Sequence, residues 1–234
     1  MSGAELKRTC MRDRIREVLI ERILDGTYPA GTQLKELTLA REFNVSQAPI
    51  REALRELEGS GLVQSERFRG TRVRGADFRE MRESYELRSM MEERAVELAA
   101  PLSPAVLAEL EQHVRQMAHA VAIADPERYI VSALAFHRRL IEASGNRAFL
   151  AVWDSLHWDV RGRVALRRLA QKGGRLKPLV ELHRALCARL RARDRAGASA
   201  KVRAIFGRIA AALADEREPS QQRPRSRVRS TPAA

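Results

Sequence analysis

Five residues between positions 46 and 51 combine hydrogen-bonding groups with small apolar ones in a way that suits the edges of DNA bases. They are Ser46, Gln47, Ala48, Pro49 and Arg51. A glutamine amide can bond adenine at N6 and N7, an arginine can bond guanine at O6 and N7, and a methyl group can meet the thymine methyl. These residue types therefore predict contact with the major groove, provided that one helix presents them on one exposed face.

The surrounding residues predict that helix. Residues 39–43 form a short amphipathic helix, Asn44-Val45 forms a tight corner, and Ser46 takes the N-cap of a second helix with Pro49 in its first turn. Two helices joined so tightly predict a helix-turn-helix, whose second helix can enter the major groove. The alternative is an ordinary corner of a helical core. The residues expected to point inward are Val45, Ile50, Ala53, Leu54 and Leu57.

The flanking residues favour the DNA-binding alternative. Apolar residues at helical spacing over 15–23 predict a further helix, and residues 62–65 and 71–74 predict two short strands. The strands enclose a basic tip, as expected of a wing that lies along phosphates. One acid, Glu66, stands against the arginines of this wing, which are Arg67, Arg69, Arg72 and Arg74. The N-terminal part is therefore predicted to be a winged helix-turn-helix.

On these residues the chain resembles the GntR family of bacterial transcription regulators. The resemblance spans residues 12–74 and includes "LAREFNVSQAPIREAL" at 39–54, "GLV" at 61–63 and "RGTRV" at 69–73. In relatives the first turn of the recognition helix, an arginine one turn later and the wing tip contact DNA. The resemblance therefore implies DNA contacts for Ser46, Gln47, Ala48, Pro49, Arg51, Arg67, Arg69, Gly70 and Thr71.

The recognition helix departs from the family pattern at two positions. Many relatives have Arg-Thr where this chain has Gln47-Ala48. Arginine favours guanine, whereas glutamine suits adenine and the alanine methyl suits thymine. We therefore expect an operator half-site that differs from the usual family site at that base pair.

Charge and length agree with two domains and a polyanionic partner. The 234 residues carry a formal net charge of +13, of which +3 lies in residues 1–75, +6 in 76–218 and +4 in 219–234. We expect a DNA-binding domain, a helical domain and a disordered basic tail over these three ranges, with a hinge at 75–79.

Cysteine content and hydropathy indicate where the protein works. The two cysteines, Cys10 and Cys187, are too few for a disulfide framework, and no N-terminal signal or long apolar run is present. We therefore expect a reduced protein of the bacterial cytoplasm, associated with the nucleoid and without a membrane partner.

Residues 76–218 show helical periodicity and predict six amphipathic helices. The fold class is thus mainly α, with a three-helix winged domain and small β-wing followed by an all-α six-helix bundle. The first of the six is expected to turn Leu87, Met90, Met91, Ala95 and Leu98 inward, and the fourth to run from Phe149 to Val164.

The bundle resembles the ligand-sensing domain, of the FCD type, found in the FadR branch of the same family. The stretches that carry this resemblance are "YELRSMME" at 85–92, "AFHRRLIEASGN" at 135–146 and "LHRAL" at 182–186. It covers residues 76–214 and implies an effector site inside the bundle.

Many domains of this branch hold a divalent metal with an aspartate, a histidine four residues later and two further histidines. Here His137 and His183 match two of these positions, but Ala133 and Ile205 stand at the other two. Two imidazoles are fewer than the three or four protein ligands that a metal normally takes, so we expect no cofactor. The remaining metal alternative is a set of His137, His183 and Cys187, which lies one turn after His183.

Direct binding of an organic effector is the preferred interpretation of the bundle. Its candidate partners are Arg88, His137, Asn146, Arg161 and His183. The basic residues between 161 and 177 are interrupted by no acid, so an effector that meets them would be an anion. The alternatives are that both histidines are satisfied core residues and that the basic run is a solvated face.

Together these patterns predict a regulator rather than an enzyme, because no nucleophile–base pair or filled metal site can be assembled. One winged domain reads few base pairs, so we expect a homodimer on a two-fold symmetric double-stranded operator. A small-molecule effector would alter the placement of the winged domains and hence operator affinity. The alternatives are a metal-dependent sensor of the same family and an architectural DNA-binding protein without effector.

Overall fold

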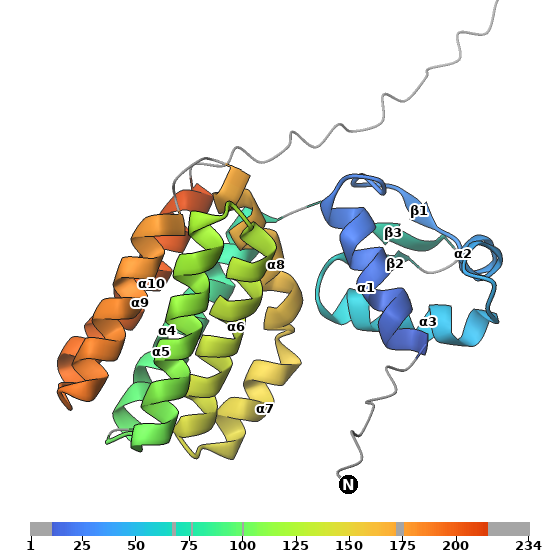
Figure 1. Ribbon diagram of the computed structural model, residues 1–234. Coiled ribbons are helices and arrows are strands. Elements are labelled where there is room, and N and C mark those ends of the chain that lie inside the picture. The colour runs from blue at the N-terminus through green and yellow to red at the C-terminus, as the bar shows by residue number, and fades with distance from the viewer. Residues whose placement is uncertain (1–10, 67–68, 76, 100, 172–175, 215–234) are drawn as a thin grey trace, which may run out of the picture.

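The computed structural model separates an N-terminal part from a larger helical part, with a short connection between them (Figure 1). The predicted domain boundary at residue 75 stays a prediction; the last strand of the first part ends at Val73 and the next helix begins at Phe78. Among the described helices, none has the length and apolar character needed to cross a bilayer. Cys10, Arg67 and the tail predicted over 219–234 lie outside the described residues, which are 11–66, 69–75, 77–99, 101–171 and 176–214.

The described N-terminal residues form three helices and a small antiparallel sheet. The strand β3 is central, with β1 on one side and β2 on the other, and Val63 lies opposite Val73. The sequence pattern predicts β2 and β3 but not β1, because a two-residue strand shows no alternation. The winged helix-turn-helix is confirmed. Its elements are α1 (Met11–Leu24), β1 (Gln33–Leu34), α2 (Glu36–Glu42), α3 (Gln47–Gly59), β2 (Val63–Glu66) and β3 (Gly70–Val73).

The corner between α2 and α3 depends on one residue in the left-handed region. Asn44 has a φ of 53°, which asparagine tolerates better than most residues, and the Val45 amide donates to the Ala40 carbonyl at 3.0 Å. Ser46 then takes the N-cap position of α3, as predicted, with an extended backbone. The inner face of α3 is at most 3% exposed and consists of Ile50, Ala53, Leu54 and Leu57. The opposite face of α3 is thereby turned to solvent.

The described C-terminal residues form seven helices, where six were expected. The single helix predicted over residues 149–164 divides at His157, whose left-handed φ of 49° separates α7 from α8. The break lets Trp158 enter the core, where it is 1% exposed. The mainly α class is confirmed. The helices are α4 (Phe78–Ala99), α5 (Pro104–Ala122), α6 (Pro126–Ala143), α7 (Arg147–Ser155), α8 (Trp158–Gln171), α9 (Leu176–Arg191) and α10 (Arg195–Ala214).

The face of α4 that enters the core differs in part from the one expected, because Met91 and Ala95 are buried as predicted but the other three residues are not. Leu87, Met90 and Leu98 are 43%, 59% and 42% exposed, whereas Arg88 and Glu92 are 2% and 0% exposed. Hydrophobicity alone favours the first set. The second set can be buried because its two charges pair with each other one helical turn apart.

Ion pairs between α1 and α8 join the two parts of the chain, and Figure 1 shows α8 at the edge of the bundle that faces the N-terminal part. The basic run that begins at residue 161 is therefore neither a wholly solvated face nor a lining of the bundle interior, because two of its arginines are held by acids of α1. The pairs are Arg16 with Asp159 at 2.9 Å, Arg163 with Glu17 at 2.6 Å and Arg167 with Glu21 at 2.5 Å.

Candidate functional site

The start of α3 presents the side chains predicted to meet base edges. Ser46, Gln47 and Ala48 are exposed, and Pro49 is half-buried. The Ser46 side chain makes no capping hydrogen bond to α3. An N-cap serine usually accepts a hydrogen bond from an amide of the first helical turn. The Ser46 hydroxyl does not, so it can donate to a base or a phosphate. We call Ser46, Gln47, Ala48 and Arg51 the recognition surface.

Arg51 is held in place by a residue that the sequence pattern did not single out. Glu36, at the start of α2, accepts hydrogen bonds from Arg51 Nε at 3.1 Å and from Arg51 Nη2 at 2.8 Å. These hydrogen bonds raise the pKa of the Arg51 guanidinium above its ordinary value. The side chain is still 51% exposed, so Glu36 orients the guanidinium at the surface rather than covering it. The only signal in the sequence was an acid in the first turn of α2.

The wing is stabilised by hydrogen bonds close to its tip. Gly70 has a φ of 77°, and the Gln33 amide donates to the Arg69 carbonyl at 2.7 Å. The hydroxyls of Thr71 and Ser65 lie 3.2 Å apart across the two strands, so Thr71 supports the hairpin from within. Arg69 projects from the tip with its side chain 75% exposed. A positive-φ glycine next to an exposed arginine suits close approach to a phosphate-lined groove.

Inside the bundle, four polar side chains form one continuous buried cluster. Arg88 Nε donates to Glu92 Oε1 at 2.7 Å, and Glu92 Oε2 lies 2.5 Å from His137 Nδ1. His137 Nε2 lies 3.1 Å from His183 Nε2, and His183 Nδ1 lies 2.6 Å from the Leu179 carbonyl. Arg88, Glu92, His137 and His183, which we call the buried polar cluster, are at most 4% exposed.

Aromatic rings surround the charged end of this cluster. The Arg88 guanidinium carbon lies 4.5 Å from the Trp153 ring centroid, 4.7 Å from Trp158 and 4.9 Å from Phe206. The centroid of the Tyr85 ring lies 5.8 Å from the same guanidinium carbon. Cation–π attraction strengthens when the ion is shielded from water, so these rings compensate part of the cost of burying Arg88. The two tryptophans are thus buried packing residues that also flank a cation.

The hydrogen-bond chain restricts where protons can sit. His183 Nδ1 must donate to the Leu179 carbonyl, so His183 Nε2 is an acceptor and His137 Nε2 must donate to it. His137 Nδ1 and Glu92 Oε2 then share one further proton. Burial lowers the pKa of His137, and it lowers the pKa of His183 to about 3, so His183 is neutral near neutral pH.

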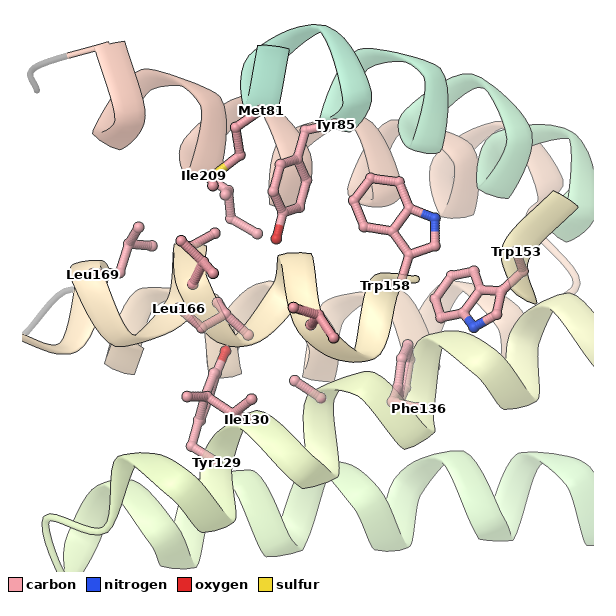
Figure 2. Packing of buried hydrophobic residues seen from close by; sticks show 14 of the residues in the cluster. Met81, Tyr85, Tyr129, Ile130, Phe136, Trp153, Trp158, Leu166, Leu169 and Ile209 are labelled. Atoms are coloured by element: carbon pink, nitrogen blue, oxygen red, sulfur yellow. The ribbon is translucent and has the colours of Figure 1, made fainter. Parts of the chain in front are cut away.

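A small cavity adjoins the cluster. Its volume is about 10 Å³, which is room for no more than one water molecule. Two buried groups on its wall, Arg88 Nη2 and the Tyr129 hydroxyl, have no hydrogen-bond partner among the described residues. Figure 2 shows the Tyr85 and Tyr129 hydroxyls directed from α4 and α6 toward the same interior region. The wall of this cavity thus offers donors that no described residue uses.

Only part of the predicted effector set meets at this cavity. Arg88, His137 and His183 line it. Asn146 instead caps α7, accepting from the Ala148 amide at 3.0 Å, because its position just before a helix satisfies that helix's first amides. Arg161 lies at the domain junction, where it pairs with Glu80 of α4.

The alternative metal set is also not brought together. Cys187, one turn after His183, does not line this cavity and instead lies in a pocket with Val114 and Glu111 of α5. Burial raises the pKa of its thiol to about 12, which disfavours the thiolate that binds metals. In the part of the chain that the structure describes, no three His, Cys, Asp or Glu side chains gather closely enough to hold a metal ion. Ala133 and Ile205 line the cavity beside the two imidazoles and supply no donor atom.

Comparison with protein families shows to which family this two-part chain belongs. The model of the FCD domain matches residues 83–208, more than half of the chain, and the model described as bacterial regulatory proteins, gntR family, matches residues 11–73. The chain belongs to the gntR family. This gntR-family chain is therefore a DNA-binding transcription regulator with an FCD domain for effector binding, not an enzyme.

Relatives of this gntR-family regulator that are named as repressors align with it over most of both chains. It is 29% identical to a probable D-xylose utilization operon transcriptional repressor of Paenarthrobacter nicotinovorans, over 82% of this chain and 84% of the relative. It is 27% identical to the gluconate operon transcriptional repressor of Bacillus licheniformis, over 74% and 73%. The solved structure of E. coli McbR/YncC matches with a TM-score of 0.70 and 25% identity, covering 87% of this chain and 96% of that one.

Replacing the oriented arginine tests the recognition surface. Arg51→Ala should weaken binding to a DNA duplex selected by the wild-type protein by about 1–3 kcal/mol, because a base contact or a close phosphate contact is lost. Fluorescence anisotropy measures the affinity. Arg128→Ala, which removes the same charge from α6, should leave the affinity unchanged. Wild-type affinity in Arg51→Ala would refute the assignment.

The buried imidazole predicts how stability depends on pH. His183 has an ordinary pKa of 6.5 in the unfolded chain but about 3 in the fold. The unfolded chain therefore takes up a proton that the native state refuses, and the free energy of unfolding should fall as the pH drops from 6.5 toward 3. Chemical denaturation of the wild type and His183→Gln should differ in slope by up to about 1.4 kcal/mol per pH unit. Parallel curves would contradict this.

Proposed function

We propose that this regulator represses transcription from a two-fold symmetric operator and responds to an anionic organic effector in its FCD domain. The observation that carries the effector class is the pair of unused buried donors, Arg88 Nη2 and the Tyr129 hydroxyl, on the wall of one cavity. A carboxylate accepts from both kinds of donor, and arginine binds it with two parallel hydrogen bonds when geometry allows. Repression is proposed because the relatives described above are named repressors.

The recognition surface and the wing would supply the DNA contacts. Gln47 and Ala48 favour adenine and thymine, and Arg69 with Gly70 would follow the phosphates. Because a transcription regulator acts on bacterial DNA, we place it in the bacterial cytoplasm.

Effector binding requires the bundle to open. A cavity of about 10 Å³ cannot hold an organic acid, so the helices around it must separate. The helix α8 contacts both the effector cavity and the N-terminal part. Its inner face carries Trp158 against Arg88, and its outer face carries Arg163 and Arg167 against α1. Displacement of α8 would therefore shift the N-terminal part directly, in addition to any effect through residues 75–79.

The exposed stripe on α4 supports the proposed homodimer. Leu87, Met90 and Leu98 lie along one face of α4 without covering from the described residues of the same chain. Glu86 and Arg94 stand four residues before and after Met90, so in an antiparallel two-fold pairing centred on Met90 each Glu86 faces Arg94 of the second copy. The stripe is thus complementary to itself in both hydrophobicity and charge.

Thermal shift tests the effector class. Full-length protein is screened with gluconate, citrate and succinate, and with the neutral compounds D-xylose and glycerol. We expect a rise in melting temperature with at least one acid and none with the neutral compounds, because the unused donors select a carboxylate. The same acid should release selected operator DNA in an anisotropy assay. A response confined to neutral compounds would remove the proposal.

A conservative variant locates the response. Tyr129→Phe removes an unpartnered buried hydroxyl, so it should leave the fold intact or more stable while weakening the response to the acid. Ser132→Ala, one turn along α6, removes a hydroxyl that bonds the Arg128 carbonyl and should respond like the wild type. Dialysis against a chelator should change nothing. A response that disappears on chelation and returns with zinc would instead favour the metal-dependent alternative.

One substitution in the stripe tests the dimer. Met90→Glu should convert the dimer into a monomer of 26.4 kDa, because two glutamates would meet at the two-fold axis. Light scattering after size-exclusion chromatography measures the mass. Val131→Glu, which replaces an equally exposed residue of α6 (58%, against 59% for Met90), should stay dimeric. A dimeric Met90→Glu protein would place the interface elsewhere.

A further inference from the structure

We propose that the junction between the two parts of the chain holds a second ligand site, which takes a small anion carrying carboxylate or phosphate groups. A cavity of about 170 Å³ opens there, well above the volume beside the buried polar cluster. Its wall combines the end of α1, the turn after α3, the end of β3, the start of α4 and the outer face of α8. A ligand in it would contact both parts of the chain at once.

Arginines dominate the charged groups on this wall. The acids are Asp77 and Glu80, and the cations are Arg74, Arg161, Arg167 and Arg168. Arg167 is already held by Glu21 and Glu127. Of the other three cations, Arg74 and Arg161 pair with the two acids of the wall, whereas Arg168 pairs with neither. Such a surplus of guanidinium groups attracts an oxyanion and disfavours a neutral or cationic ligand.

Two of these arginines, one from each part of the chain, converge on the same point. Glu80 forms an ion pair with Arg74, whose Nη2 lies 2.7 Å from Oε2, and its Oε1 accepts a hydrogen bond from Arg161 Nη1 at 3.3 Å, so it draws the two arginines together. Their other ends, Arg74 Nη1 and Arg161 Nη2, lie 3.6 and 3.7 Å from the place where a Cβ on Gly61 would stand. Neither end has a hydrogen bond within the described residues. One oxyanion could therefore accept from both parts of the chain.

Arg168 offers a third donor. Its guanidinium lies 5.5 Å from the centroid of the Phe78 ring, and it makes no ion pair with any described residue. Stacking on an aromatic ring fixes the plane of a guanidinium while leaving its N–H groups available. Three guanidinium groups around one cavity favour a compact ion with more than one negative charge, such as phosphate or a polycarboxylate.

Gly61 connects this site to DNA binding, because it follows the recognition helix α3 by two residues. An anion held between Arg74 and Arg161 would join the end of α3 to α8. Occupancy would therefore favour the arrangement of the two parts seen here over any other. This site is separate from the effector cavity of the bundle, and its existence does not depend on the effector proposed above.

Calorimetric titration of the full-length protein with inorganic phosphate, and separately with citrate, tests the site. Ionic strength is held constant with sodium chloride. We expect saturable binding of at least one of the two ions below about 10 mM, and the two titrations distinguish a phosphate source from a carboxylate source. No binding beyond a chloride control would overturn the proposal.

Variants identify the cavity. Arg161→Gln and Arg168→Gln should each weaken binding at least about tenfold; Arg168 makes no ion pair with any described residue, so its loss should leave the fold intact. Arg163→Gln, which breaks an ion pair of the same helix outside the cavity, should keep wild-type affinity. Tyr129→Phe should also keep it, which separates this site from the bundle. Equal affinity in the wild type, Arg161→Gln and Arg168→Gln would overturn the proposal.

Discussion

The burial of one arginine constrains the arrangement of the bundle. An isolated buried charge costs several kcal/mol, so Arg88 requires a carboxylate within hydrogen-bond distance and polarisable surroundings. Glu92 supplies the first, and rings from α7, α8 and α10 supply the second. His137 then satisfies the second oxygen of Glu92 and connects α4 through α6 to His183 on α9. Six helices, α4 and α6 to α10, thus meet around this guanidinium and its partners.

This constraint also explains why the FCD domain can respond to a ligand. A core of hydrocarbon alone would offer an anion nothing, whereas the wall of this cavity carries two donors, Arg88 Nη2 and the Tyr129 hydroxyl, that no described residue uses. The same helix that contacts the arginine carries, on its other face, the ion pairs to α1. Rearrangement inside the bundle and placement of the winged domain therefore share α8 as a common rigid element. The coupling needs no long pathway through the chain.

The DNA interface is built on a different principle. Its inner half is an apolar helix face packed on α1, and its outer half is polar, exposed and oriented by short-range contacts such as Glu36 with Arg51. Preorganised side chains lose less conformational entropy when they bind. The winged domain therefore keeps its reading surface whatever the bundle does, and in the proposed mechanism the effector changes only where that surface is held.

The sequence by itself determined the winged helix-turn-helix, because the apolar spacing, Asn44 at the corner and Ser46 at the cap all act within a few residues of one another. It also determined the helical class and three members of the buried cavity wall. Only the tertiary structure decided which face of α4 is buried and where Arg161 lies. Both depend on partners far along the chain, since Glu92 meets His137 at a separation of 45 residues and Arg161 meets Glu80 at 81. Local periodicity ranks hydrophobic residues above charged ones, and it contains no information about a distant group that makes a buried charge stable.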